Sequence, residues 1–318
     1  VDVTGADGKV TSYTASHIII ATGARSRQLP NLPQDGKKII GYREAMSLPK
    51  QPKSLVVVGS GAIGVEFAYF YATMGTKVTI VEFLPTIVPV EDEEVSKQLE
   101  KSFKKAGIEI MTDASVESMD TKGEGCKVNV KTKTGNVVLD ADIVLSAVGI
   151  ESNISGIGLE ETGIKTDKGK IVTDKFYATN VPGYYAIGDV TPGQALAHVA
   201  SAEGIICVEK IKGMHVEPLD YGNIPGCTYA TPEIASVGLT EKAAKEKATQ
   251  DSIAAVEAAK AAEEAAKAQA AQDSINAVNA AKEAEAKRIA DSIEAAKTTK
   301  PAKSHTAPTK KKEVKAGE

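Results

Sequence analysis

The chain has 318 residues, of which 42% are hydrophobic and 25% are charged, and its formal net charge at pH 7 is −4. This length is enough for about two domains, and the composition is ordinary for a soluble globular protein. The longest apolar runs fall well short of the ~18 residues that span a bilayer, so no membrane association is expected. No nucleic-acid partner is expected either.

Three cysteines, Cys126, Cys207 and Cys227, are too widely spaced to form a CxxC pair or a disulfide framework. The chain does not open with a positively charged segment followed by an apolar block, so no secretory signal is predicted. A reducing, cytoplasmic setting is therefore the expectation, and no metal site is predicted.

The first predicted elements lead into a βαβ unit. An alternating pattern around an ADGK turn predicts a hairpin, and residues 16–21 predict a buried strand. Residues 54–58, SLVVV, predict a strand buried on both faces of a parallel sheet. The segment AIGVEFAYFYATMG has helical spacing with Gly75 as its stop, and TKVTIVE predicts the next strand.

An amphipathic helix is predicted for EDEEVSKQLEKSFKKAG, with its acids first, its lysines near the end and Gly107 as the stop. The strands IEIMT, ASVESMD, CKVNVKT and VVLDADIVLSAVG predict an antiparallel meander attached to the parallel sheet. Beyond them, a strand is predicted for GYYAIGD and a helix for ALAHVASAEGIICVEKI. The first strands of a further domain are predicted for IPGCTYATPEIASVGLT.

The last part of the chain has a different composition. From Lys247 onward, 23 of 72 residues are Ala, and no aromatic residue follows Tyr229. Six β-branched residues fall within an arc of about 100° at 100° per residue, which predicts a long helix with a sparse apolar stripe. They are Ile253, Val256, Ile275, Val278, Ile289 and Ile293. The Pro- and Lys-rich residues 298–318 are predicted to be disordered.

A glycine fingerprint carries the chemistry. Gly59, Gly61 and Gly64 form G-x-G-x-x-G between a predicted strand and helix, where a helix N-terminus offers amide groups to a pyrophosphate. Glu82 ends the next strand and would accept hydrogen bonds from the ribose hydroxyls of the nucleotide. Its charge would repel a 2′-phosphate, which favours NAD over NADP.

The segments IIIATGA, GSGAIGVE and YYAIGDV occur in the order found in the flavoprotein disulfide reductases, a family that residues 1–247 resemble. Within that family the motifs resemble most closely the enzymes that oxidise a dihydrolipoyl group with NAD. The resemblance implies these NAD-binding residues: Gly59, Ser60, Gly61, Ala62, Ile63, Gly64, Glu66, Glu82, Val116 and Gly149. It implies these FAD-binding residues: Ala21, Thr22, Gly23, Ala24, Asp189, Ala195, Leu196, Ala197 and His198. In the family, Glu66 faces a lysine that this chain does not contain, so Glu66 is expected to lack a partner.

The fold class implied by the resemblance is α/β. A Rossmann-like three-layer NAD-binding domain is inserted in a partial FAD-binding domain, and a long helical low-complexity segment follows. The expected parts are a partial FAD-binding domain at 1–48, the NAD-binding domain at 49–151, the remaining FAD-binding or central domain at 152–222, the truncated start of a dimerisation domain at 223–247, an Ala-rich helix at 248–297 and a disordered tail at 298–318.

The implied reaction converts a dihydrolipoyl group and NAD into a lipoyl group and NADH through FAD. The family's redox disulfide, CxxxxC, and its HPTxxE segment are not found in this chain, so no catalytic residue is predicted and the segment by itself is expected to be inactive. The implied partners are lipoyl domains of 2-oxo acid dehydrogenase complexes and a second subunit, although the interface domain is expected to be truncated. The alternatives are an NAD-binding module without turnover, or another flavoprotein disulfide reductase or NADH oxidase.

Overall fold

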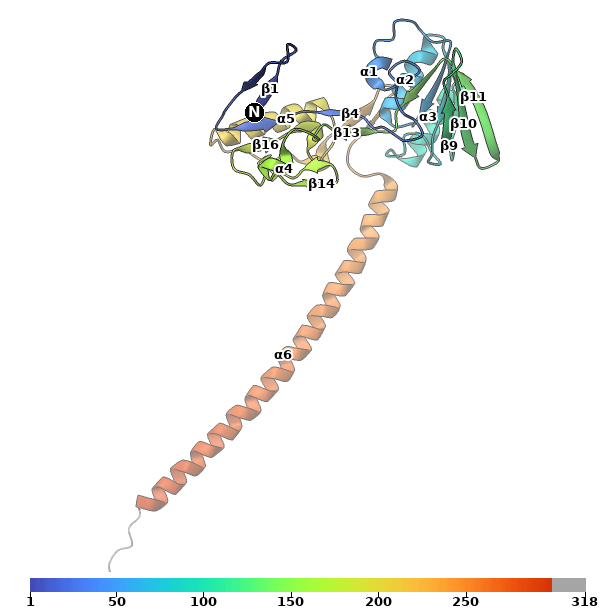
Figure 1. Cartoon of the computed structure of the whole chain (residues 1–318). Helices are drawn as coiled ribbons and strands as arrows, with labels where there is room; N and C mark the ends of the chain where they lie inside the picture. Colours follow the sequence, from blue (N-terminus) through green and yellow to red (C-terminus); the bar gives the residue numbers. More distant parts are fainter. Residues whose placement is uncertain (299–318) are drawn as a thin grey trace, which may run out of the picture. The chain divides into compact units, whose positions relative to one another are not determined.

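The computed structural model describes residues 1–298, and the chain divides into two compact units (Figure 1). Unit 1 comprises residues 1–244, and unit 2 begins at Lys245. The tail predicted to be disordered lies outside the described residues, except for Thr298.

A five-stranded parallel sheet forms the centre of unit 1. From one edge to the other its strands are β5 (Ile39–Ile40), β12 (Ile143–Ser146), β6 (Ser54–Val58), β7 (Lys77–Val81) and β8 (Glu109–Met111). All neighbouring strands run parallel. The predicted parallel strands β6 and β7 are confirmed, whereas the placement of IEIMT in the meander is wrong, because β8 is the edge strand of this sheet.

The two faces of the sheet are covered differently. Helices α2 (Ala62–Thr73) and α3 (Glu93–Lys105) pack on one face, where they share an apolar cluster with Leu55 and Val57 of β6. The alternate residues Val56 and Val58 face the other side and contact an antiparallel sheet. Its strands are β9 (Ser115–Asp120), β10 (Cys126–Thr132) and β11 (Gly135–Ala141). The unit is therefore a mixed α/β structure around a parallel sheet.

One predicted strand, VVLDADIVLSAVG, proves to be two. β11 pairs antiparallel with β10 as far as Ala141, and β12 then enters the parallel sheet beside β6. The carboxylate of Asp142 stands between them and accepts hydrogen bonds from the amides of Lys53 (2.6 Å) and Ser54 (3.2 Å). These bonds tie the start of β12 to the start of β6, so the chain changes sheets at this residue.

The rest of unit 1 contains short paired strands and helices. The strands are β1 (Asp2–Thr4), β2 (Val10–Ser12), β3 (Ile18–Ile20), β4 (Ala24–Ser26), β13 (Ile150–Ser152), β14 (Thr166–Asp167), β15 (Lys170–Ile171), β16 (Tyr184–Ala186), β17 (Gly226–Thr228) and β18 (Ile234–Ser236). The helices are α1 (Tyr42–Ala45), α4 (Leu159–Thr162), α5 (Ala197–Ile211) and the 3₁₀ turns η1 (Gly188–Val190) and η2 (Tyr221–Asn223). The predicted hairpin is confirmed, because β1 and β2 pair antiparallel. The prediction that β3 is buried is wrong, because β3 pairs with β16 in a two-stranded sheet that leaves Ile19 36% exposed.

Helix α6 (Glu241–Thr298) has 58 residues, starts in the last residues of unit 1 and forms the described part of unit 2. It begins seven residues before the predicted position of 248. The reason is an N-cap at Thr240, whose hydroxyl accepts a hydrogen bond from the amide of Ala243 (3.2 Å). From residue 245 to residue 297 every side chain of the helix is exposed.

Candidate functional site

The turn between β6 and α2 carries the three glycines of the fingerprint. Gly59 has a φ of +97°, and a Cβ there would collide with the carbonyl oxygen of Ala147. A Cβ on Gly64 would collide with the carbonyl oxygen of Gly59, so α2 lies close against the end of β6. Gly61 has a φ of −65°, and a Cβ there would meet no atom within 4 Å. The fold itself requires glycine at Gly59 and Gly64, and leaves open space at Gly61.

The first turn of α2 offers unpaired amide groups beside that space. Gly61 is the N-cap, and the first backbone hydrogen bond of the helix runs from the amide of Val65 to the carbonyl of Gly61 (3.0 Å). Within residues 1–298, the amides of Ala62, Ile63 and Gly64 have no hydrogen-bond acceptor. The first turn also contains no acidic residue, so a positive helix end faces the open space at Gly61.

Glu82 lies directly after β7 and is 7% exposed. Its Oε2 accepts hydrogen bonds from the amide of Ser60 (2.8 Å) and from the hydroxyl of Ser60 (2.7 Å), and its Oε1 accepts one from the amide of Leu84 (2.8 Å). Both donors of Ser60 therefore hold Glu82, and the carboxylate is fixed beside the glycine turn. Oε1 retains acceptor capacity for one further donor.

Backbone hydrogen bonds bring the segments of two more predicted nucleotide-binding residues, Val116 and Gly149, close to this turn. The amide of Ala114 donates to the carbonyl of Glu82 (2.9 Å), which places Val116 two residues away on β9, with its side chain buried between the sheets. The amide of Ala147 donates to the carbonyl of Val58 (2.8 Å), and Gly149 follows with a φ of +104°. The glycine turn, Glu82 and the segments that carry Val116 and Gly149 thus meet at the carboxyl end of the parallel sheet.

Glu66 has a partner, and the expectation that it lacks one is wrong. Its side chain is partly buried on α2, and its Oε1 accepts a hydrogen bond from the amide of Tyr229 (2.8 Å). Tyr229 directly follows β17, which contacts α2. The partner is a backbone amide from a distant segment, so no pattern of charged residues could have indicated it.

The predicted flavin-binding residues form a second group. Ala21–Ala24 is held by Asn153, which donates to the carbonyl oxygens of Thr22 (3.0 Å) and Gly23 (2.9 Å) and accepts from the hydroxyl of Thr22 (2.6 Å). Because β3 and β16 are parallel, the residues that follow them lie at the same edge. The amide of Ile187 donates to the carbonyl of Ile20 (3.1 Å), which brings the residues before Asp189 beside the start of this segment.

Asp189 is half-buried in η1. Its backbone carbonyl accepts hydrogen bonds from the hydroxyl of Ser152 (2.6 Å) and the ammonium of Lys170 (2.5 Å). Its carboxylate makes no hydrogen bond or ion pair with any residue in 1–298. The backbone of Asp189 is therefore fixed while its carboxylate remains available.

Helix α5 supports this second group with a glutamate that the sequence analysis missed. Glu203 is 1% exposed, and its carboxylate accepts hydrogen bonds from the amide of Gly188 (2.5 Å) and from the hydroxyl of Tyr221 (2.5 Å). The spacing in the sequence could have indicated its burial, since Glu203 lies four residues from Val199 and from Cys207 on the buried stripe of α5. Of the predicted residues at the start of α5, Leu196 is partly buried, and Ala195, Ala197 and His198 are exposed.

The three cysteines are separate thiols. Cys126 and Cys207 are buried, and Cys227 is exposed. Burial raises the pKa of the Cys126 and Cys207 thiols, which disfavours their reactive thiolate forms. Among residues 1–298, no three His, Cys, Asp or Glu side chains gather closely enough to hold a metal ion. In the same range, no helix is both long and apolar enough to cross a membrane.

The chain belongs to the pyridine nucleotide-disulphide oxidoreductases, because residues 1–204 match that family. Within the family it is dihydrolipoyl dehydrogenase-like. It is 52% identical over 237 residues to a dihydrolipoyl dehydrogenase of Rhizobium etli, covering 74% of this chain and 49% of the relative. It is 41% identical over 249 residues to leghemoglobin reductase of Glycine max, covering 77% of this chain and 47% of the relative.

Residues 224–289 match the family's dimerisation domain. Among solved structures, LpdA from Mycobacterium tuberculosis superimposes with a TM-score of 0.70 at 33% identity, covering 76% of this chain and 52% of that one. The flavoprotein disulfide reductase RclA from Escherichia coli gives a TM-score of 0.65 at 29% identity, covering 72% of this chain and 53% of that one. The chain therefore spans about half the length of the relatives it matches.

Proposed function

We propose that this chain carries the NAD site and part of the FAD site of a dihydrolipoyl dehydrogenase-type oxidoreductase. The observation that supports the proposal best is the open space at Gly61, which neither backbone strain nor packing explains. A pyrophosphate close to the backbone accounts for a glycine there, because any side chain would fill the approach.

In this proposal the amides of Ala62, Ile63 and Gly64 bind the pyrophosphate, and Oε1 of Glu82 accepts a hydrogen bond from a ribose hydroxyl. The backbone near Val116 and Gly149 completes the nucleotide site. The fixed negative charge of Glu82 selects NAD over NADP. Bound NAD supplies a hydride acceptor, and the protein supplies orientation and binding.

The second group of residues is proposed as the FAD side. Ala21–Ala24 would contact the flavin nucleotide, the available carboxylate of Asp189 would bind a hydroxyl of the ribityl chain, and Ala195–His198 would lie at the flavin edge. The corresponding domains are an NAD-binding domain at 49–151, inserted between FAD-binding segments at 1–48 and 152–222, and the start of a dimerisation domain at 223–247. The whole enzyme would oxidise dihydrolipoyl groups on the lipoyl domains of 2-oxo acid dehydrogenase complexes.

Calorimetric titration of the full chain with NAD and with NADP tests the nucleotide site. We expect NAD to bind at least about tenfold more tightly than NADP, because only NADP brings a phosphate against the carboxylate of Glu82. In Glu82→Ala the preference for NAD should shrink, while the exposed control Glu233→Ala should keep it. Absence of heat with millimolar NAD would exclude the proposed site.

An NAD-binding module without turnover is the second candidate, because the exposed Ala195, Ala197 and His198 leave the flavin side less enclosed than the glycine turn. The visible absorbance of the purified chain after dialysis against FAD separates the two candidates. A flavin spectrum that NADH bleaches supports the oxidoreductase. NAD binding without retained flavin supports the module.

A further inference from the structure

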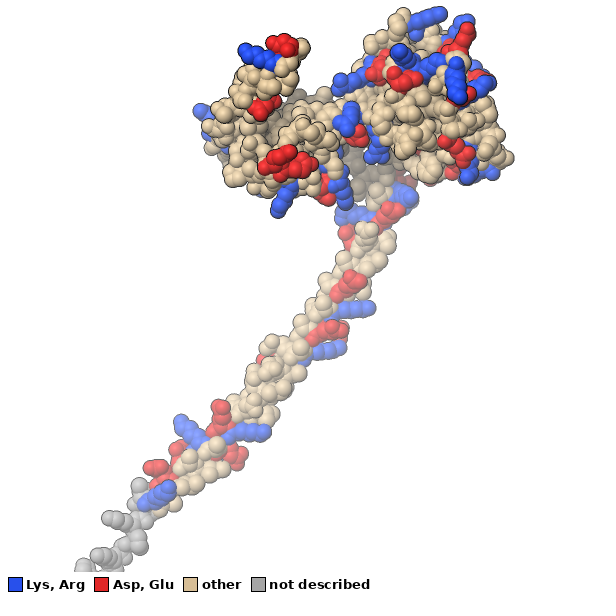
Figure 2. All heavy atoms as spheres, in the orientation of Figure 1, with Lys and Arg blue, Asp and Glu red and all other residues tan. Residues whose placement is uncertain are grey.

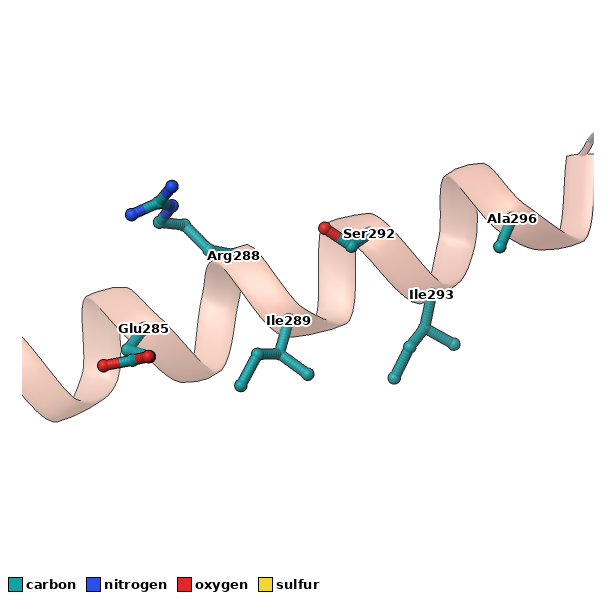
Figure 3. A pocket seen from close by; sticks show the side chains of 6 residues that line it. All are labelled: Glu285, Arg288, Ile289, Ser292, Ile293 and Ala296. Atoms are coloured by element: carbon teal, nitrogen blue, oxygen red, sulfur yellow. The ribbon is translucent and has the colours of Figure 1, made fainter.

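The apolar stripe of α6 is continuously exposed. Its six β-branched side chains are between 52% and 55% exposed, which is a uniform value along the helix. Figure 3 shows Ile289 and Ile293 projecting to one side of the helix, while Arg288 and Ser292 project to the other. Within residues 245–298 the stripe therefore has no partner from its own chain.

Charged residues interrupt the stripe in two clusters. Between residues 253 and 293, six charged residues fall within the same arc of about 100° as the β-branched residues: Glu257, Lys260, Glu264, Lys267, Lys282 and Glu285. Lys267 pairs with Glu263 on the same helix (2.6 Å), and the other five make no ion pair with another residue in 1–298. Figure 2 shows the charged groups of α6 separated by uncharged stretches.

A second copy of α6 in parallel, in-register alignment would be unfavourable. Each residue of the stripe would face its own copy, so Lys260 would meet Lys260, and Glu264 would meet Glu264. Lys282 and Glu285 would repeat the same conflict. Like charges placed opposite one another destabilise a helix pair and set its orientation.

The antiparallel alignment removes every one of these conflicts. When Ile253 of one copy faces Ile293 of the other, the next apolar layer joins Val256 to Ile289. Moving inward along the same register, Lys260 then faces Glu285. Two-fold symmetry repeats each contact at the other end of the helix pair.

The next charged layer of this register fits as well. Glu264 faces Lys282, and both lie on the same flank of the stripe, as a two-fold axis perpendicular to the helices requires. Nearer the centre, Ala271 faces Ile275. The register that aligns these apolar layers also aligns these two pairs of opposite charges, and between them Lys267 faces Val278.

We propose that α6 binds α6 of a second copy of this chain as an antiparallel helix pair in this register. The chemistry of the occupant is given by the stripe itself, because its reversed copy places apolar residues opposite Ile253 and Val256 and opposite charges at Lys260 and Glu264. The proposal specifies a surface and a direction, and it does not depend on nucleotide binding.

Analytical ultracentrifugation of the full chain and its charge variants tests the surface. Lys260→Glu places two like-charged pairs in the dimer and should raise its dissociation constant at least about tenfold. Adding Glu285→Lys to the same chain restores opposite charges only in the antiparallel register, so affinity should return to within about threefold of the original. Lys287→Glu makes the same exchange on the opposite face and should change the constant less than about twofold. Circular dichroism confirms that helix content is equal in all variants.

Cysteine crosslinking tests the direction. Two differently tagged full chains, both with Cys227→Ser, carry Ile253→Cys in one and Ile293→Cys in the other. These positions are about 60 Å apart along one helix, so only an antiparallel pair can join them between copies. Oxidation should give the mixed disulfide dimer and neither self-linked dimer, and Lys287→Cys should not crosslink.

Three results would overturn the proposal. The first is a monomer at every concentration, which would mean that α6 is a solvated single helix. The second is self-linked products without the mixed one, which would indicate a parallel pair. The third is a dimer whose dissociation constant is unchanged by Lys260→Glu, which would place the contact outside the stripe, for example in residues 224–240.

Discussion

Gly59, Gly61 and Gly64 belong to one turn, but they are not all glycine for the same physical reason. At Gly59 the backbone is left-handed, and at Gly64 a neighbouring carbonyl oxygen occupies the place of a Cβ. At Gly61 the backbone suits any residue and the space is open. The fold requires glycine only at Gly59 and Gly64. Substitutions there should therefore affect stability, whereas a substitution at Gly61 should affect ligand binding.

Alanine substitutions should reveal this separation. Gly59→Ala and Gly64→Ala should each lower the free energy of unfolding by at least about 2 kcal/mol, because of strain and overlap. Gly61→Ala should lower it by less than about 1 kcal/mol and weaken NAD binding at least about tenfold. Urea unfolding and calorimetric titration on the same samples measure both quantities. A Gly61→Ala protein that binds NAD normally would remove the main support for the proposed site.

At the scale of elements, the contact between α5 and η1 depends on one buried carboxylate. Glu203 joins α5 to the amide of Gly188 and to the hydroxyl of Tyr221, and Tyr221 also lies 3.3 Å from the hydroxyl of Tyr177. Burial raises the pKa of the Tyr221 phenol, and the hydrogen bond to Glu203 raises it further. Burial also raises the pKa of Tyr177. The neutral phenols are therefore part of the folded structure.

The raised pKa values determine how stability depends on pH. A phenol whose pKa is higher in the folded than in the unfolded chain contributes stability that is complete below the unfolded value, about 10, and is lost as pH rises above it. The free energy of unfolding should therefore fall above pH 10, and less steeply in Tyr221→Phe. At pH 7, Tyr221→Phe should cost about 1 to 3 kcal/mol, because Glu203 loses a donor. Tyr13→Phe, at an exposed tyrosine, is the control, and an equal slope in both variants would contradict this account.

At the scale of the whole molecule, the two units are stabilised by different interactions. Unit 1 has buried apolar clusters on both faces of its parallel sheet. The side chains of α6 from residue 245 to residue 297 are all exposed, so backbone hydrogen bonds, alanine propensity and i,i+4 pairs such as Lys247 with Asp251 support the helix within one chain.

NAD should therefore stabilise the two units unequally. At a concentration of 100 times its dissociation constant, NAD should add about 2.7 kcal/mol to the unfolding free energy of unit 1. Hydrogen exchange followed by mass spectrometry should show slower exchange in residues 59–66 and 113–116, and no change in residues 245–298. Equal protection of both regions would show that binding is not confined to the glycine turn.

The sequence by itself determined the features that depend on local spacing. The glycine fingerprint, Glu82 after the second strand, the stops at Gly75 and Gly107 and the long alanine-rich helix all follow from periodicity, backbone conformation and charge position, which neighbouring residues fix. The predicted meander is confirmed in part, for the strands β9, β10 and β11, which short turns connect.

Only the tertiary structure decided which distant segments meet. IEIMT joined the parallel sheet, β12 left the meander at Asp142, and Glu66 bonded to an amide 163 residues away. Each outcome depends on a hydrogen-bond partner supplied by a remote backbone, and a backbone amide is the same in every residue other than proline. Side-chain patterns therefore cannot encode such partners, and the folded chain alone reveals them.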